Sequence, residues 1–456
     1  MKHSSVIGLG KSGIAAARLL KAQGWSVTVS DRNQSDALSD IKATLNQDGI
    51  DVELGAAFVP DASQTQQIVV SPGVPWDHPA LCTARELGID TLGEMELAWR
   101  SLQSSSWIGI TGTNGKTTVT SLIAAIFQAA GLTAPSCGNI GNAASEVALT
   151  AKLDATFRPD WVIAEISSYQ IESASTLAPQ IGVWTTFTPD HLSRHKTLEK
   201  YFNIKASLLN RSAVQVLNGD DPHLRRVGDR LWPNAIWTST TGADNLVAHA
   251  DKGAYIESGW VMMAGDPILP VDALRMVGDH NRQNLLMAVA VARIAGIEKE
   301  AIAHAIETFP GVPHRLERVC TWNGIQFIND SKATNYDASE VGLQAVDAPV
   351  VLIAGGEAKD GDDTAWIETI HQKANAVVLI GSAAEHFNQR LSQSNFSACT
   401  ICSGLDDAVP YAAQWAKEHD ARIVLLSPAC ASFDQYANFE ERGNHFRSIC
   451  LSHFGV

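Results

Sequence analysis

The sequence predicts an α/β protein with three domains and mainly parallel sheets. The chain has 456 residues, which at about 150 residues per domain corresponds to about three compact units. Short apolar strands alternate with helical segments in three blocks, a pattern typical of parallel sheets covered by helices. Two of these blocks open with a glycine-rich loop between a strand and a helix, as nucleotide-binding folds do.

The composition predicts a globular protein of the cytoplasm. Hydrophobic residues make up 45% of the chain and charged residues 18%, which is enough apolar material for ordinary cores. The formal charge of −15 argues against broad attraction to nucleic acid or anionic lipid. No apolar run approaches the ~18 residues of a membrane span, and the first residues lack a secretory signal. The 7 cysteines are scattered, so we expect free core thiols, including Cys399 and Cys402.

The first block opens as a βαβ unit, with strands at 5–9 and 26–30 around a helix at 13–22. Its loop, residues 8–13, has the pattern G-x-G-x-x-G, and Asp31 ends the next strand. Glycines allow a pyrophosphate to approach the backbone, and the helix start offers N–H donors. NAD or FAD is the first interpretation, although any nucleotide diphosphate fits. A rigid turn at 71–75, after a strand at 68–70, should lie at the same sheet edge.

The second block contains a phosphate loop. A strand at 107–110 leads into Thr-Gly-Thr-Asn-Gly-Lys-Thr at 111–117, and a helix follows to 130. Backbone N–H groups of such a loop surround phosphate oxygens, Lys116 can reach the terminal phosphates, and the Thr117 hydroxyl can bind Mg²⁺. The strict pattern has glycine where Ile110 stands, but every mechanistic part is present. An ATP loop beside a diphosphate loop argues against a simple dehydrogenase.

Acidic and imidazole candidates follow two further strands of this block. Glu165 lies in the apolar strand 161–166, where its carboxylate could bind Mg²⁺ or pair with a neighbouring base. After a strand at 183–187 come His191 and His195, whose spacing would place them on one helix face. Zinc is not expected, because Leu192 occupies the position that a zincin fills with glutamate.

The third block begins after a helix at 299–308 and contains strands at 350–354, 376–380 and 423–426. The order of motifs along the whole chain resembles that of the ATP-dependent Mur ligase family. The motifs that carry the resemblance lie at 8–13, 71–73, 111–118, 138–141, 165–170, 190–191, 278–281, 313–315, 329–335, 427–434 and 439–443.

The resemblance implies a UDP-substrate-binding domain with a Rossmann-like fold (residues 1–103), a central P-loop ATPase domain (104–311), and a Rossmann-like domain that brings an amino acid (312–456). It also implies a reaction in which ATP phosphorylates the carboxylate of UDP-N-acetylmuramoyl-L-alanine and the amine of D-glutamate displaces the phosphate. This reaction belongs to cytoplasmic peptidoglycan precursor synthesis, and hence to cell wall biogenesis, cell shape and cell division. The expected partners are the two organic substrates, and the expected cofactors are ATP and two Mg²⁺ ions. The protein is expected to be a monomer.

Three alternatives stay open at this point. A related ligase of the same family could add L-alanine, diaminopimelate or, to folate, glutamate. A nicotinamide-dependent oxidoreductase would leave Lys116 without a role. A nucleotide-regulated binding protein or motor would not need the run at 330–332.

The resemblance also implies roles for individual residues. Lys116, Glu165, His191 and Lys205 would be catalytic, and Lys205, as a carbamate, would join Thr117, Glu165 and His191 as a metal ligand. ATP would contact Gly112, Thr113, Asn114, Gly115, Lys116, Thr117, Thr118, Asn281, Asn284, Arg315 and Asp330, although Asn281 and Asn284 could equally cap a helix. The UDP substrate would contact Lys11, Ser12, Arg32, Ser71, Gly73, Asn139 and His191. D-Glutamate would contact Lys332, Thr334, Lys359, Ser432, Phe433 and Phe439.

Overall fold

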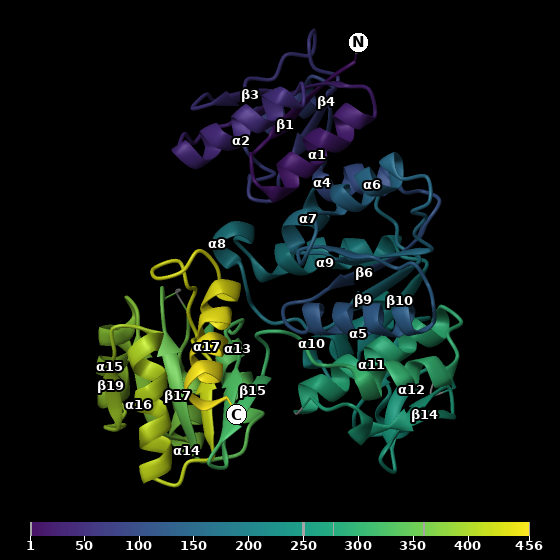
Figure 1. Ribbon diagram of the computed structural model, residues 1–456. Helices are drawn as coiled ribbons and strands as arrows, with labels where there is room; N and C mark the ends of the chain where they lie inside the picture. Colours follow the sequence, from purple (N-terminus) through teal and green to yellow (C-terminus); the bar gives the residue numbers. More distant parts are fainter. Residues whose placement is uncertain (1, 249–250, 277, 359–360, 456) are drawn as a thin grey trace. The chain divides into compact units, whose positions relative to one another are not determined.

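The structure, a computed structural model, describes residues 2–248, 251–276, 278–358 and 361–455, which form three β-sheets with helices around them (Figure 1). This confirms the predicted α/β class. The chain divides into two compact units: Met1–Ala273 with Arg282–Thr308, and Leu274–Asn281 with Phe309–Val456. The first unit holds two sheets and the second holds one, whereas the boundaries at 103 and 311 stay a prediction. No helix in the described ranges combines the length and apolar character needed to cross a membrane.

The first sheet is entirely parallel, and its strand order among the described residues is β3-β2-β1-β4-β5. The strands are β1 (His3–Ile7), β2 (Ser26–Asp31), β3 (Asp51–Leu54), β4 (Gln67–Val70) and β5 (Asp90–Gly93). Helices α1 (Lys11–Ala22) and α2 (Asp36–Gln47) cover one face, and α3 (Pro79–Glu86) covers the other. The strand predicted at 5–9 starts and ends earlier, because Leu9 already belongs to the glycine loop.

The second sheet surrounds the phosphate loop and is parallel except at β12–β14. Its order is β14-β13-β12-β11-β10-β9-β6-β8-β7 in the part of the chain that is described. The strands are β6 (Ser106–Thr111), β7 (Ser136–Gly138), β8 (Trp161–Glu165), β9 (Ile181–Trp184), β10 (Val214–Asn218), β11 (Ile236–Ser239), β12 (Ala254–Glu257), β13 (Trp260–Met263) and β14 (Asp266–Pro270). The helices of this region are α5 (Lys116–Ala129), α6 (Ala144–Leu153), α7 (Ser168–Glu172), α8 (Leu192–His195), α9 (Leu198–Arg211), α10 (Pro222–Leu231), α11 (Asp279–Ile294) and α12 (Lys299–Thr308).

Apolar strand residues explain how this second sheet is covered. Trp107 and Trp184 are buried; the Trp107 ring contacts Trp99, and the Trp184 ring contacts Phe202 of α9. Leu208 of α9 and Leu224 of α10 belong to the same core. Helices α5 and α12 pack against each other, and α5 also contacts β6 and β8. The strand predicted at 183–187 instead ends at Trp184, so the residues that follow are available to contact the phosphate loop.

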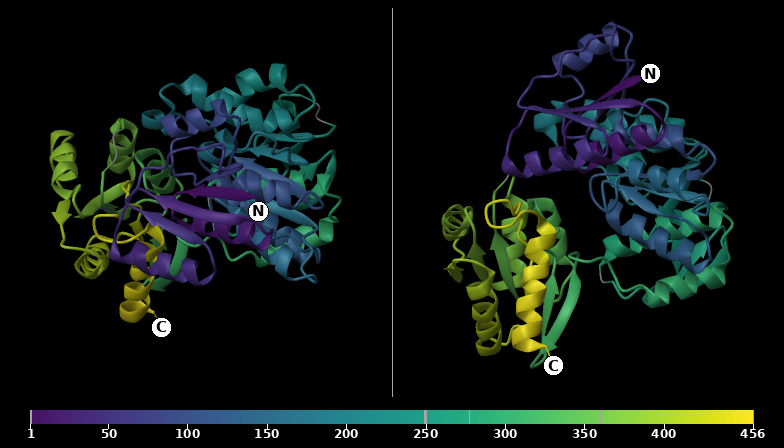
Figure 2. Two further views of the ribbon diagram at one scale, coloured as in Figure 1. Left: turned by 90° about the horizontal axis from the view of Figure 1, so that it is seen from above. Right: turned by 45° about the horizontal axis from the view of Figure 1, so that its top comes forward.

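The third sheet belongs to the second unit and has the order β15-β16-β20-β17-β18-β19 within the described residues. Its strands are β15 (Glu317–Trp322), β16 (Ile325–Asn329), β17 (Val350–Gly355), β18 (Ala374–Ile380), β19 (Cys399–Ile401) and β20 (Ile423–Leu426). Only the β15–β16 pair is antiparallel among these described strands. Helices α13 (Tyr336–Gln344), α14 (Thr364–Lys373) and α15 (Ala384–Gln393) cover one face, and α16 (Leu405–Glu418) and α17 (Phe439–Phe454) cover the other (Figure 2). The cysteines are free, as expected, and burial raises the pKa of Cys399 to about 11.

Helix α4 (Glu94–Ser101) connects the two sheets of the first unit. The Glu94 carboxylate accepts a hydrogen bond from the backbone N–H of Ser145 at the start of α6, at 2.6 Å. Glu96 accepts the backbone N–H groups of Thr176 and Leu177, each at 3.1 Å. Both carboxylates are buried, and burial raises the pKa of Glu94 to about 7. Two buried acids of α4 therefore attach the helix that follows the first sheet to residues 145 and 176–177, which lie in the region of the second sheet.

Candidate active site

The phosphate loop joins the end of β6 to the start of α5. Gly112 has φ of +151° and Gly115 has φ of +83°, which are backbone conformations that favour glycine. Gly115 is also the N-cap residue immediately before α5, so the positive end of the helix dipole faces the loop. The Lys116 ammonium donates to the carbonyl oxygens of Gly112 at 2.9 Å and Thr113 at 2.8 Å. The local geometry is that of a site for an anionic phosphate.

Two oxygen donors meet beside this loop. The Thr117 hydroxyl donates to Glu165 Oε2 at 2.8 Å, and the Asn139 side-chain amide donates to Glu165 Oε1 at 2.8 Å. Glu165 ends β8 and is only 1% exposed. A hydroxyl and a carboxylate at this separation suit a hard divalent cation such as Mg²⁺. The structure thus brings together Thr117 and Glu165, two of the predicted metal ligands, and adds Asn139, which was predicted to bind the UDP substrate.

Lys205, on α9, is buried beneath the loop. Its ammonium nitrogen donates to Gly112 O at 2.9 Å and to Thr111 Oγ1 at 3.2 Å, and it lies 4.8 Å from the centre of the Tyr201 ring. Burial, together with the nearby charge of Lys116, lowers the Lys205 pKa well below its usual value. Because its pKa is depressed, this amine is suited to be neutral, and a neutral amine is a nucleophile.

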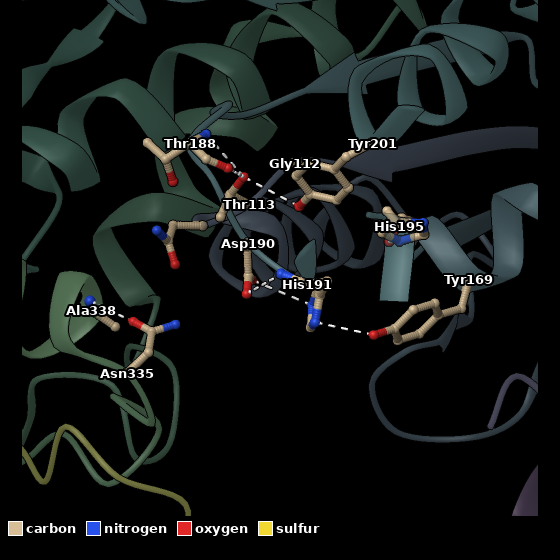
Figure 3. Close-up of polar contacts among 12 residues, drawn as sticks. Gly112, Thr113, Tyr169, Thr188, Asp190, His191, His195, Tyr201, Asn335 and Ala338 are labelled. Carbon is tan, nitrogen blue, oxygen red and sulfur yellow. Dashed lines mark hydrogen bonds and ion pairs between the residues drawn. The ribbon is translucent and has the colours of Figure 1, made fainter. Parts of the chain in front are cut away.

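His191 and His195 do not share a helix face, so that prediction is wrong. His191 precedes α8 with φ of +54°, and its side chain is 42% exposed, whereas His195 ends the helix and is fully buried. Both rings nevertheless contact Tyr169, with centroids 5.2 Å apart for His191 and 5.4 Å apart for His195. His191 Nδ1 lies 3.2 Å from the Tyr169 hydroxyl, and its Nε2 lies 3.3 Å from Asp190 (Figure 3).

His195 is part of an aromatic stack that the sequence reasoning did not identify. Its ring stacks on Tyr169 and Tyr201, with centroids 5.4 Å apart in each case, and its Nε2 lies 2.9 Å from the Ser168 hydroxyl. Burial and neighbouring cations lower the His195 pKa to about 4. Tyr169 lies inside the recognised run 165–170, but nothing in the sequence indicated that Tyr169 and Tyr201 sandwich this imidazole. The stack connects the His191 turn to the helix that carries Lys205.

No cluster of three or more His, Cys, Asp or Glu side chains suited to a metal occurs in the described part of the chain. The predicted metal set includes only two residues of these types, Glu165 and His191. Its remaining protein donors would be the Thr117 hydroxyl and a modified Lys205.

The glycine loop of the first sheet meets the 71–75 turn. Gly8 has φ of +96°, and its carbonyl accepts the Ser71 hydroxyl at 3.0 Å. Asp31 accepts the Leu9 N–H at 2.8 Å, so this carboxylate holds the loop itself. The other predicted contacts for a UDP substrate surround this sheet edge: Lys11 and Ser12 begin α1, exposed Arg32 follows β2, and exposed Gly73 follows β4.

In the second unit, Asp330 is 5% exposed at the end of β16. It accepts hydrogen bonds from the Ser427 hydroxyl at 2.8 Å and the Leu316 N–H at 3.3 Å. Burial raises its pKa to about 7, while the charge of Arg315 opposes that shift. Arg315, the other member of the predicted pair, is therefore near enough for its charge to favour the ionised form of Asp330.

Two of the residues predicted to bind the amino acid, Lys332 and Phe439, are neighbours in this unit. The Lys332 ammonium lies 5.4 Å from the Phe439 ring centre, Ser432 is buried and Phe433 is 70% exposed. Thr334 is half-buried in the loop after β16, and Lys359 lies outside the described residues. Asn281 and Asn284 are the third and sixth residues of α11, so the alternative that they cap a helix is wrong.

Arg442 was missed by the sequence reasoning, although it lies within the recognised run 439–443. Its guanidinium is 1% exposed and donates to the Ser331 hydroxyl at 3.0 Å, to Ser331 O at 2.8 Å and to Cys430 O at 3.0 Å. Burial lowers the Arg442 pKa to about 10. One side chain thus holds together the loops that follow β16 and β20, which carry Lys332 and Ser432.

Comparison with known families assigns the class of protein. Residues 2–93 match the family model described as Mur ligase MurD-like, N-terminal domain. Residues 110–292 match the Mur ligase middle domain, and residues 314–430 match the Mur ligase, glutamate ligase domain. The chain belongs to the Mur ligase family.

Curated relatives are similar over the whole length. The UDP-N-acetylmuramoylalanine--D-glutamate ligase of Trichodesmium erythraeum is 61% identical over 99% of this chain and 96% of its own. The ligases of the same name from Trichormus variabilis and Synechocystis sp. are 60% and 58% identical and cover 100% and 99% of both chains.

Solved structures share the fold at low identity. A pseudomurein peptide ligase type C from Methanothermus fervidus has a TM-score of 0.60 at 20% identity and covers 99% of this chain and 100% of its own. The UDP-N-acetylmuramate-alanine ligase of Thermotoga maritima has a TM-score of 0.60 at 17% identity, with 99% of each chain covered.

Proposed function

We propose that this chain is the ATP-dependent ligase that joins D-glutamate to UDP-N-acetylmuramoyl-L-alanine in peptidoglycan precursor synthesis. The observation that carries the proposal is the phosphate loop of Lys116 and Thr117 beside the buried carboxylate of Glu165, in a chain about 60% identical to D-glutamate ligases over its full length. The structure of the loop supports ATP use, and the relatives support the identity of the two substrates.

The chemistry follows from the poor reactivity of a carboxylate. An oxygen of the L-alanyl carboxylate attacks the γ-phosphorus of ATP, the bond to the β–γ bridging oxygen breaks, and ADP leaves. The amine of D-glutamate then attacks the acyl carbon, a C–N bond forms, the C–O bond to phosphate breaks, and the amine loses a proton. Lys116, together with the N-terminus of α5, would stabilise negative charge on the transferred group.

Mg²⁺ would be held by Thr117 and Glu165, with His191 and a carbamylated Lys205 serving a second ion. A bound Mg²⁺ neutralises phosphate charge and orients phosphate oxygens for in-line transfer. The Lys205 amine is buried with a lowered pKa, which supports carbamate formation. In that step the neutral nitrogen attacks CO₂, an N–C bond forms and one proton is released. The ammonium is thereby replaced by a carboxylate able to bind a cation.

The two ends of the chain would bind the two organic substrates. The UDP part would lie on the glycine loop of the first sheet, near Lys11, Ser12, Arg32, Ser71 and Gly73, with Asn139 and His191 nearer the reacting end. D-Glutamate would bind near Lys332, Thr334, Lys359, Ser432, Phe433 and Phe439, because a cation and hydroxyls match an anionic amino acid. Asn281, Asn284, Arg315 and Asp330 would contact ATP. The enzyme would act as a monomer in the cytoplasm, where ATP and the UDP-linked precursor are made.

A single assay tests this proposal against the alternatives. Phosphate release is measured with ATP, UDP-N-acetylmuramoyl-L-alanine and, in parallel reactions, D-glutamate, L-glutamate, L-alanine or diaminopimelate. Of the four amino acids, we expect only D-glutamate to support turnover, with one amide formed for each ADP released. Turnover with another amino acid, steady ATP hydrolysis without the UDP substrate, or reduction of NAD would contradict the proposal.

A further inference from the structure

The segment after β9 is bonded to the phosphate loop along the length of both. Thr185 N–H donates to Thr111 O at 2.9 Å, which extends the β6–β9 pairing by one residue. Thr113 N–H then donates to Thr186 O at 2.8 Å, and the Thr113 hydroxyl donates to Thr188 O at 3.0 Å (Figure 3). The loop is therefore held from one side by residues more than seventy positions later in the chain.

The hydroxyl of Thr186 makes a closed pair of contacts with one residue of the loop. Thr186 Oγ1 accepts the Asn114 N–H at 2.9 Å and lies 3.2 Å from Asn114 O, to which it can donate. The hydroxyl of Thr185 donates to the same carbonyl. The backbone N–H and the backbone C=O of Asn114 are thus both bound by threonine side chains. While these bonds persist, the N–H groups of Thr113 and Asn114 donate within the protein, so a phosphate would be bound by other donors of the loop and by the start of α5.

Close packing reinforces this arrangement. A Cβ added to Gly112 would lie 1.9 Å from Thr185 Oγ1 and 3.0 Å from Thr186 N. The phosphate loop at Gly112 and the segment 185–186 are therefore so close that only glycine fits at this position. This leaves the loop no space to move toward β9 when a ligand arrives.

A second layer holds the threonine segment in place. The Asn218 side-chain amide, at the end of β10, donates to Thr185 O at 2.9 Å. The Asp221 carboxylate, at the start of α10, accepts the Phe187 N–H at 2.7 Å. Asn218 is 1% exposed and Asp221 is 6% exposed, so both bonds are shielded from water. Residues of β10 and α10 thus hold the segment that follows β9, and this segment in turn holds Asn114.

We propose that Thr186 is a positioning residue for ATP: its hydroxyl fixes the Asn114 peptide so that the phosphate loop is in its binding conformation before the nucleotide arrives. The inference rests on the proposed function, because it assigns the loop to ATP. Loss of the hydroxyl leaves the partly buried N–H and C=O of Asn114 without that partner, which favours other loop conformations. The cost falls on nucleotide binding, whereas the UDP substrate binds on a different sheet.

The test compares three variants of the full chain. Thr186→Val keeps the shape and removes the hydroxyl, and Thr186→Ser restores the hydroxyl. Thr238→Val is the matched control, since Thr238 is a fully buried threonine of β11 in the same sheet whose hydroxyl has no hydrogen-bond partner among the described residues. Affinity for ATP and for ADP is measured by calorimetric titration, and KM and kcat are measured separately.

We expect Thr186→Val to weaken nucleotide binding by about 10-fold or more, with a rise in KM for ATP larger than the fall in kcat and with binding of the UDP substrate unchanged. Thr186→Ser should recover most of the affinity, and Thr238→Val should bind as the wild type does. Wild-type affinity in Thr186→Val, or no recovery in Thr186→Ser, would overturn the inference. Failure of the wild-type chain to bind ATP would refute the proposed function instead.

Hydrogen exchange of the wild-type chain tests the same inference without any variant. In the absence of nucleotide, the amides of Thr113 and Asn114 should already be protected, because both donate within the protein. Exchange of these amides at the rate of an unstructured loop, with protection only after ATP is added, would also overturn it.

Discussion

The buried carboxyl group of Glu94 should make the stability of the first unit depend on pH. Its pKa rises from 4.5 to about 7, mainly because burial disfavours the charged form. The raised pKa gives stability that is fully present below about pH 4.5 and is lost as the pH rises through about 7, because the folded state binds more protons than the unfolded state in that window. The shift corresponds to about 3 kcal/mol.

A Glu94→Gln variant removes this titration while its side-chain oxygen can still accept the Ser145 N–H. Urea unfolding followed by tryptophan fluorescence would be measured for the wild type and the variant from pH 5 to pH 8. Glu86→Gln is the matched control, since Glu86 is an exposed carboxylate at the end of α3 in the same unit and does not contribute to the Glu94 shift. We expect the stability of the wild type and of the control to decline relative to Glu94→Gln as the pH rises. Parallel curves for all three proteins would refute the reasoning.

Three further predictions concern the phosphate loop. Lys116→Ala should abolish amide formation and leave affinity for the UDP substrate nearly intact, because the two loops lie on different sheets; equal loss of both, measured by product assay and titration, would contradict separate roles. Lys205→Ala should stop turnover and regain part of it when short carboxylic acids are added, which a product assay checks; a complete lack of rescue would count against the carbamate. Gly112→Ala should lose nucleotide affinity, because the added Cβ would lie 1.9 Å from Thr185 Oγ1 and a strained backbone of this kind costs about 1–3 kcal/mol. Titration with nucleotide measures the loss, and unchanged affinity would show that the loop has room to move.

Local patterns predicted the elements whose determinants are adjacent in the chain. The apolar run before Gly112 and the helix after Lys116 were found because the strand, the loop and the helix follow one another directly along the chain. The buried strands at 350–354 and 423–426 were equally visible as short apolar runs. A carboxylate in an apolar strand indicated that Glu165 could bind a cation. Lys205 received its expected role only from the resemblance to a family, because periodicity alone could not supply it.

Contacts between distant residues were not predictable in this way. The Thr186 hydroxyl binds a residue 72 positions earlier, and Arg442 binds Ser331 across 111 positions. Single polar residues in such places look like ordinary loop or helix residues, because their roles depend on which strand ends become neighbours. The spacing of His191 and His195 misled for a related reason. His191 is a left-handed residue that precedes α8, and spacing predicts a shared face only when both residues are inside the helix.

The position of β20 in the third sheet has a consequence for the synthesis of the protein. This strand is the last of the sheet in sequence, yet it lies between β16 and β17, which come about seventy to one hundred residues earlier. A nascent chain that has not yet released Ile423–Leu426 from the ribosome holds two half-sheets with no strand to join them. The first sheet, in contrast, has all its strands once Gly93 has emerged. The first sheet, with its glycine loop, can therefore assemble as soon as β5 has emerged, while the third sheet closes its core only after β20, the last of its strands in sequence, has emerged.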